Sequence, residues 1–197
     1  SVDLVSPAPW RRYDAQRDGI SLGEAAGFAL LERADAGNDA APLLLGYGEA
    51  SDAHHMSTPH PQGLGAERAL DDALARAGLS TDAIDYINMH GTASSKNDEV
   101  EAALVARRFP ATTHASSTKG FTGHTLGAAG IVEAVISLLA LENGWMPGTI
   151  NSSTLDADCG PQIRLRGERG NVRHALSNSF GFGGNNCALI FGKGAAA

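Results

Sequence analysis

The chain has 197 residues, of which 43% are hydrophobic and 19% are charged, and its formal net charge is -7. This length is enough for one ordinary domain with its own core, and the composition is that of a globular protein. The negative charge argues against a globally basic nucleic-acid-binding protein, so small-molecule or protein substrates are favoured.

Cysteine usage and hydropathy bear on the location of the protein. Cys159 and Cys187 form no CxxC pair, and the chain has no secretory signal. This pattern fits a reducing compartment better than a disulfide framework. We predict no apolar run long enough to span a membrane. We therefore expect a cytoplasmic protein.

The first 42 residues differ from the rest. Residues 1–19 are polar and irregular and do not begin with Met, which predicts that the chain is a fragment. Residues 28–32, Phe-Ala-Leu-Leu-Glu, favour a strand, although the alanine-rich flanks leave a short buried helix open. Residues 34–42 are predicted to form a flexible link.

From residue 43 onward, strands and helices alternate in the predicted pattern. The predicted strands are a buried one at 43–48, then 84–89, 112–116, 175–180 and 187–191, the last two joined by a hairpin at 181–186. The predicted helices are 64–77, stopped by Gly78, then 98–108, and 125–142, closed by Asn143-Gly144. The last helix is apolar nearly all round, which indicates burial. Residues 43–197 should therefore form one layered α/β domain with a mixed five-stranded sheet.

Polar residues follow two of these strands where chemistry is expected. His90 comes directly after the strand at 84–89, Gly91 allows a sharp turn, and the hydroxyls of Thr92 and Ser94 follow. A second histidine, His124, lies in a glycine-rich loop after the next strand. One histidine after a strand is more often a turn or core residue. Two at matching positions of one sheet edge favour a shared site.

The loop with the second histidine runs into the apolar helix at 125–142. A helix N-terminus carries unsatisfied N–H groups and partial positive charge, so His124 placed there should resist protonation, the more so with Lys119 nearby. A neutral imidazole can donate a hydrogen bond to a substrate. The sequence thus predicts Lys119 and His124 at the mouth of one helix.

Other candidate motifs are weaker. His54, His55 and His60 share a proline-containing loop without the spacing of a helical metal-binding pair, so we expect no metal site there. His114 and His174 are expected to be structural. Gly46-Tyr47-Gly48 lacks the third glycine of a dinucleotide-binding loop, and neither cysteine has the setting of a strand-to-helix nucleophile.

Four blocks in order resemble one family. They are Arg17-Asp-Gly-Ile-Ser-Leu-Gly-Glu-Ala-Ala-Gly27, His90-Gly-Thr, Ser117-Thr-Lys-Gly-Phe-Thr-Gly-His124 with Gly127-Ala-Ala-Gly130, and Ser177-Asn-Ser-Phe-Gly-Phe-Gly-Gly184. Together they resemble the C-terminal half of the elongating β-ketoacyl-[acyl-carrier-protein] synthases of the FabF and FabB type. The resemblance implies a thiolase-like fold of two similar α/β halves. Residues 43–197 would be the C-terminal domain, and residues 1–42 a tail with the last strand of the missing N-terminal half.

The resemblance also implies roles for individual residues. His90 and His124 would be the paired histidines, Lys119 the accompanying lysine, and Glu133 a buried acid that orders this lysine. Phe182 would be a gating residue whose backbone N–H joins the oxyanion hole. Thr92 and Ser94, and with less support Ser57, would face the phosphopantetheine arm of the substrate. The run Ala93-Ser94-Ser95 departs from the usual pattern, so substrate handling could differ.

The implied reaction is a decarboxylative Claisen condensation of malonyl-carrier with an acyl thioester in fatty acid or polyketide synthesis. The substrates are carried on acyl carrier protein, no separate cofactor is implied, and the nucleophilic cysteine lies before residue 1. Implied partners are the N-terminal half of the synthase, a second subunit in a homodimer or heterodimer, and the carrier, for which Arg11 and Arg12 could offer positive charge. Neither nucleic acid nor a membrane is implied. Two alternatives are open: a non-catalytic subunit of the chain-length-factor kind and, with less support, a thiolase.

Overall fold

The structure is a computed structural model that describes residues 5, 11–17, 19–34 and 41–194. Its main sheet has five strands in the order β1-β7-β6-β2-β3, with β2 parallel to β3 and β6, and β7 antiparallel to β6 and β1. The strands are β1 (Leu43–Ser51), β2 (Tyr86–Asn88), β3 (His114–Ser116), β6 (His174–Gly181) and β7 (Asn185–Gly192). A separate two-stranded sheet joins β4 (Trp145–Met146) to β5 (Glu168–Arg169). The predicted mixed five-stranded sheet is confirmed.

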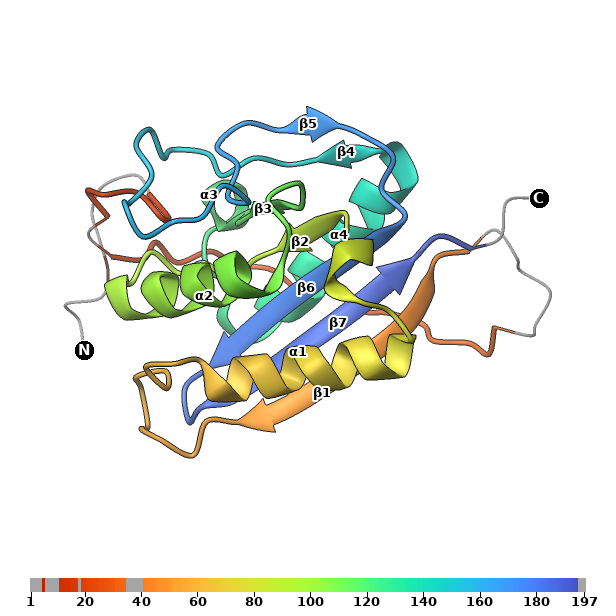
Figure 1. Ribbon diagram of the computed structural model, residues 1–197, viewed down its shortest axis with the longest axis horizontal. Helices are drawn as coiled ribbons and strands as arrows, with labels where there is room; N and C mark the ends of the chain where they lie inside the picture. Colours follow the sequence, from red (N-terminus) through yellow and green to blue (C-terminus); the bar gives the residue numbers. More distant parts are fainter. Residues whose placement is uncertain (1–4, 6–10, 18, 35–40, 195–197) are drawn as a thin grey trace.

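Helices cover both faces of the main sheet, as Figure 1 shows. α1 (Leu64–Ala77) and α2 (Ser95–Arg108) supply one core with Ile87, Leu176 and Ile190 of the sheet. α4 (Ala129–Asn143) packs on the opposite face, in a second core with Tyr86 and Phe191. Short helical turns complete the chain at η2 (Thr81–Ala83), α3 (Lys119–Thr122) and η3 (Leu126–Ala128).

The two glycines of β1 allow α1 to lie directly on this strand. A Cβ added at Gly46 would fall 2.2 Å from the carbonyl oxygen of Ala73, and one at Gly48 would fall 1.9 Å from that of Ala69. These glycines therefore serve packing. The prediction that β1 is a buried strand is wrong for most of its residues, since only Gly46 and Gly48 are buried. β1 is one of the two edge strands, and its buried glycines are those that face α1.

The last helix is less buried than predicted. It begins with the separate turn η3 and continues as α4, which ends at Gly144 in the left-handed conformation, with φ 60°. Val135 and Leu139 are about half exposed, because only the face toward the sheet is covered. By length and composition alone, residues 126–143 could span a membrane, contrary to the prediction. Core helices of soluble proteins pass the same test, so this is weak evidence for a span.

The strand expected at residues 28–32 is not formed. Residues 23–33 carry no strand assignment, and Phe28 and Leu30 are 98% and 85% exposed. A strand needs a partner for its N–H and C=O groups. In the described part of this segment, isolated bridges join Ile20 to Val5 and Leu22 to His124, and none is formed at residues 23–34. Most of the expected link at 34–42 lies outside the described residues.

Candidate active site

The turn after β2 places His90 at the carboxyl end of the sheet. Gly91 has φ 38°, and a Cβ there would lie 2.5 Å from Cβ of Ser117, so the turn requires glycine. The backbone N–H groups of His90 and Gly91 each donate to the carboxylate of Glu101 at 2.8 Å. His90 is thereby almost fully buried in a fixed position.

A second carboxylate of α2 holds the next two residues of the turn. Asp98 accepts the N–H groups of Thr92 and Ala93 on Oδ1, at 3.1 Å each. Asp98 and Glu101 are three residues apart, so they share the buried side of α2. Sequence reasoning missed both. The available signal was two acids at helical spacing just after the His90-Gly91-Thr92 turn.

Lys119 follows β3 and lies in the one-turn helix α3. Its side chain is 1% exposed and forms an ion pair with Glu133 of α4. The ammonium also donates to the carbonyl oxygen of His90, and Nζ lies 3.3 Å from Nδ1 of the His90 ring. The expected contact between Lys119 and the buried acid Glu133 is therefore present. Lys119 does not, however, share the helix mouth of His124, because α3 is separate from η3 and α4.

His124 is held by its backbone and by the start of η3. Its N–H donates to the carbonyl oxygen of Ser21 at 2.9 Å, and its own carbonyl oxygen accepts from Gly23 at 3.1 Å. The backbone N–H of Leu126 donates to Nδ1 of the His124 ring at 3.2 Å. The segment at 20–23 and the helix start together fix the ring.

The two imidazoles meet, as the matching strand positions predicted. The ring centroids of His90 and His124 are 5.5 Å apart with an interplanar angle of 83°, and the Phe180 ring lies 5.5 Å from that of His90. Both histidines line a pocket of about 640 Å³, which also includes Ser179 and Leu126. The pocket opens at the carboxyl end of β2.

Burial and the neighbouring cations keep both imidazoles neutral. Burial, then the charge of Lys119, lowers the pKa of His124 to about 4 and that of His90 well below its usual value. The sequence predicts a neutral His124 from the helix end and from Lys119; the structure bears out the effect of Lys119, but burial is the largest cause of the lowered pKa. Burial also lowers the pKa of Lys119 and raises that of Glu133 to about 7, and the attraction between the two opposes both shifts.

The hydrogen bonds also fix which nitrogen of each ring carries the proton. An ammonium and a backbone N–H can only donate, so Nδ1 of His90 accepts from Lys119 and Nδ1 of His124 accepts from Leu126. In a neutral ring the proton then sits on Nε2. The site therefore holds two neutral imidazoles, each with its ring proton on Nε2.

Residues 42–153, more than half of the chain, match the family described as "Beta-ketoacyl synthase, C-terminal domain". The chain belongs to this family. Two relatives are the mitochondrial 3-oxoacyl-[acyl-carrier-protein] synthase of Arabidopsis thaliana, 41% identical over 192 residues, and 3-oxoacyl-[acyl-carrier-protein] synthase 2 of Rhizobium meliloti (strain 1021), 42% identical over 191 residues. The alignments cover 92% and 91% of this chain but only 42% and 44% of the relatives. This chain thus spans less than half the length of these relatives.

Solved ketosynthase structures share the fold. The structure titled "The ishigamide ketosynthase/chain length factor" matches with a TM-score of 0.91 and 34% identity, over 98% of this chain and 49% of that one. A type II polyketide ketosynthase in complex with its acyl-carrier protein matches with a TM-score of 0.90 and 27% identity, over 98% of this chain and 51% of that one. The predicted thiolase-like fold is confirmed.

The predicted substrate-contact residues and Phe182 are not among the residues that line the histidine pocket. Thr92 is buried beside the His90 turn, and its hydroxyl lies 2.9 Å from that of Ser94. Ser57 is exposed on the loop at 52–62. Phe182 is 69% exposed in the turn between β6 and β7. Their roles toward a substrate stay predictions.

The loop of Ser57 is joined to the turn of Phe182. Gly183 N–H donates to the carbonyl oxygen of Met56 at 2.7 Å, and Asp52 N–H donates to that of Gly184 at 2.8 Å. The Asp52 carboxylate accepts from His60 N–H at 2.9 Å and from Asn186 Nδ2 at 3.1 Å. Any movement of the Phe182 turn must therefore break or carry these contacts.

The remaining predicted residues have ordinary structural contacts. Nε2 of His114 lies 2.8 Å from the carbonyl oxygen of Pro147, and Nδ1 of His174 lies 2.9 Å from that of Ala83. Burial raises the pKa of both cysteine thiols, that of Cys159 to about 11. Within the described ranges, no group of three or more histidine, cysteine or acidic side chains is arranged for a metal ion.

The position of Arg12 contradicts the prediction that this residue offers positive charge to a carrier protein. It is fully buried, and a Cβ added at Gly120 would fall 2.6 Å from its Nη1 atom, so it lies beside Lys119 instead of on the surface. Burial lowers its pKa to about 9. Arg11 is half-buried and donates to Gln16 at 3.1 Å. The prediction that both arginines together form a positively charged docking surface is therefore wrong.

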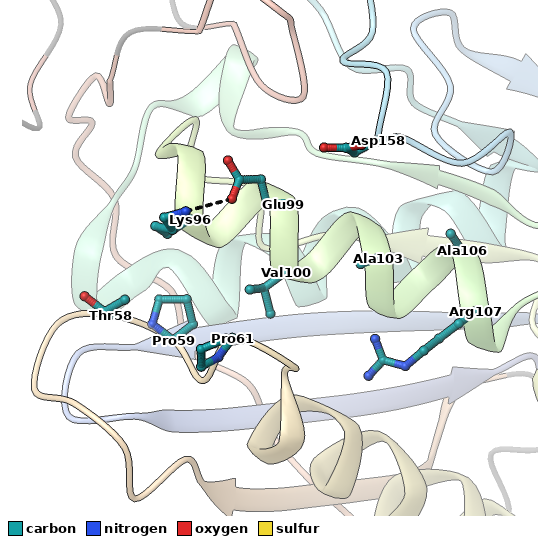
Figure 2. A pocket seen from close by; sticks show the side chains of 10 residues that line it. All are labelled: Thr58, Pro59, Pro61, Lys96, Glu99, Val100, Ala103, Ala106, Arg107 and Asp158. Carbon is teal, nitrogen blue, oxygen red and sulfur yellow. Dashed lines mark hydrogen bonds and ion pairs between the residues drawn. The ribbon is translucent and has the colours of Figure 1, made fainter.

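A larger hollow, of about 810 Å³, lies on the outer side of α2. Figure 2 shows its floor of Val100, Ala103 and Ala106, the loop prolines facing them, and Lys96 paired with Glu99 at 3.1 Å. This side of α2 faces away from the carboxylates that hold the His90 turn. The hollow contains no convergent set of buried polar groups, so the candidate site is the histidine pocket.

Proposed function

We propose that this chain supplies the decarboxylation and condensation residues of a 3-oxoacyl-[acyl-carrier-protein] synthase. The observation that carries the proposal is the pair of adjacent neutral imidazoles whose Nδ1 atoms accept hydrogen bonds, which places the proton of each ring on Nε2. Membership of the synthase family and the names of the relatives support the same reaction class.

The reaction explains why two donors are needed. When a malonyl thioester loses carbon dioxide, the electrons of the broken C–C bond pass to the thioester as an enolate, whose oxygen becomes negative. Two preplaced Nε2–H groups, from His90 and His124, would stabilise this oxygen, and a donor of this kind is typically worth about 3 kcal/mol. The enolate carbon then attacks the acyl thioester and displaces the thiolate that carried it.

Other residues of the chain would support these two donors. Lys119, held by Glu133, would keep Nδ1 of His90 occupied and its pKa low. Phe182 would act as a gate, and its backbone N–H would join the oxyanion hole. Thr92 and Ser94, with Ser57 at the rim, would contact the phosphopantetheine arm. The acyl group would sit on a cysteine supplied from outside this chain, and the substrates would need no separate cofactor.

The proposed partners are an acyl carrier protein, the part of the synthase that carries the cysteine, and a second subunit. The solved neighbours include a ketosynthase with a chain length factor and one bound to an acyl-carrier protein. A cytoplasmic location stays a prediction.

The test is His124→Ala in the intact protein. We expect carbon dioxide release from malonyl-carrier to fall at least about a hundredfold, since one donor of the pair is lost. Acyl transfer from acyl-carrier to the enzyme should change less than about threefold. The matched control is His174→Ala, whose ring Nδ1 lies 2.9 Å from the carbonyl oxygen of Ala83. Loss of acyl transfer alone would contradict the role proposed for His124.

The second candidate is a non-catalytic subunit of the chain-length-factor kind, favoured by the resemblance to the ishigamide ketosynthase/chain length factor structure. The assembled Lys119-Glu133 pair and the fixed tautomers of both histidines favour the catalytic assignment. The two differ experimentally. A non-catalytic subunit would tolerate substitution of both His90 and His124 without loss of condensation by its complex.

A further inference from the structure

Tyr13 lies beneath the His90 turn although it is far away in sequence. Its side chain is fully buried, and its hydroxyl donates to Oε2 of Glu101 at 2.6 Å. Its backbone is in the left-handed region, with φ 53°, which is rare for a bulky residue. Asp98 accepts its N–H at 3.0 Å, and Asp156 N–H donates to its carbonyl oxygen at 2.8 Å. The surrounding groups therefore hold it in this conformation.

The same carboxylate that binds Tyr13 holds the histidine turn. Glu101 accepts from His90 N–H on Oε1 and from Gly91 N–H on Oε2, and this second oxygen also accepts from the Tyr13 hydroxyl. A Cβ added at Gly91 would lie 2.9 Å from the Tyr13 oxygen. The hydroxyl therefore packs directly against the turn and fixes the orientation of the carboxylate.

We propose that Tyr13 is a positioning residue of the active site, whose hydroxyl orients Glu101 so that the His90-Gly91 turn holds the His90 imidazole toward its partner. The inference rests on the proposed function. Tyr13 belongs to no motif of the site. It lies 88 residues from Glu101 in sequence and acts on the His90 turn only through this carboxylate.

The charges around Glu101 determine what loss of the hydroxyl would do. They are Tyr13, Asp98 on the same helix, Lys119 on α3 and Glu133 on α4, beside the neutral ring of His90. Burial raises the pKa of Glu101, while the bonds from Gly91, Tyr13 and His90 oppose this rise. Loss of the Tyr13 hydroxyl should therefore raise the pKa of Glu101 further, so that its carboxylate is protonated at a higher pH. A protonated carboxyl loses acceptor capacity, so the turn loosens.

The experiment is Tyr13→Phe in the intact protein, with malonyl decarboxylation measured across pH. We expect the acid limb of the profile to move up by about one pH unit, so that kcat at a pH on this limb falls about tenfold with KM changed less than about twofold. Raising the pH should restore most of the activity. The matched control is Tyr86→Phe, another fully buried tyrosine, whose hydroxyl lies 3.4 Å from Ser116 Oγ. The pH profile of decarboxylation by Tyr86→Phe should match that of the wild type.

Two further measurements keep the outcome decisive. Hydrogen exchange at the His90 and Gly91 amides should speed up in Tyr13→Phe, and this readout needs no activity. If Tyr13→Phe does not fold, Glu101→Gln replaces it, and the part of the acid limb due to Glu101 should disappear. An unshifted profile with unchanged amide exchange would overturn the inference. A wild-type protein that does not decarboxylate malonyl-carrier would refute the proposed function, while amide exchange would still test the Tyr13 contact.

Discussion

At the scale of single residues, the behaviour of the site depends on which protons its histidines hold. Nδ1 of each ring accepts a hydrogen bond, from Lys119 and from Leu126 N–H, and burial disfavours the charged form. Both imidazoles are therefore neutral, with the proton on Nε2, at neutral pH, and neither ring changes its protonation state there. The same burial has a cost for the fold in acid, because a buried neutral histidine resists the proton that the unfolded chain accepts.

This cost predicts the pH dependence of stability. The pKa of His124 is lowered from 6.5 to about 4, so the unfolded state binds more protons between these values and stability falls as the pH drops through them. Compared with His124→Gln, the wild type should lose about 1–2 kcal/mol more between about pH 7 and pH 4.5, after allowance for the partial exposure of the ring. Urea unfolding of the intact protein at several pH values measures this.

Glu133 contributes the opposite slope. Its pKa is raised to about 7, so the folded state binds more protons and this contribution to stability falls as the pH rises from about 4.5 to 7. Because Glu133 is present in both proteins, its effect cancels in the comparison. Equal pH slopes for the wild type and His124→Gln would contradict the protonation state assigned to His124.

At the scale of elements, the contact between β1 and α1 depends on the absence of side chains. A Cβ at Gly48 would fall 1.9 Å from the carbonyl oxygen of Ala69, which is backbone and cannot rotate away. β1 follows the link and leads into the loop that contacts the Phe182 turn. Separation of β1 from α1 would therefore also disturb the rim of the pocket.

Gly48→Ala should destabilise the intact protein by about 3 kcal/mol or more, because the strand and the helix must move apart. Gly127→Ala is the matched control, since nothing lies within 4 Å of its added Cβ. It should change the free energy of unfolding by less than about 1 kcal/mol. Urea midpoints of the two variants test the prediction. A Gly48→Ala protein as stable as Gly127→Ala would refute the close contact.

At the scale of the whole molecule, one apolar surface stands out. Phe28, Leu30 and Leu31 are exposed on the segment after residue 27, and Val135 and Leu139 are exposed on α4. The two parts touch where Gly27 meets Ile131: a Cβ at Gly27 would lie 2.8 Å from Cγ1 of Ile131. Exposed apolar patches are typical of surfaces that pack against another protein segment.

The patch gives a test of the predicted boundary at residue 42. If residues 28–32 pair as the last strand of another half, their amides should exchange at least about a hundredfold more slowly in the intact protein than in this chain alone. Hydrogen exchange followed by mass spectrometry measures this. Equally fast exchange in both would contradict the assignment of residues 1–42.

The local features of the fold could be predicted from the amino-acid sequence. Hydrophobic periodicity and Gly78 placed α1, and the glycine-rich turns placed the β6–β7 hairpin. The matching positions of His90 and His124 after two strands predicted that they meet. Each of these features depends on the spacing of residues within a short segment of the chain. Hydrophobic periodicity and the residues typical of turns indicate such spacing directly.

The residues that support the site and the conformation of residues 28–32 depend on tertiary contacts. Tyr13 contacts Glu101 across 88 residues of sequence, so no local pattern could join them. Burial of Arg12 and the half-exposed face of α4 depend on which elements pack against them. Residues 28–32 have strand-like composition but no strand, because a strand forms only when a second chain segment satisfies its backbone hydrogen bonds.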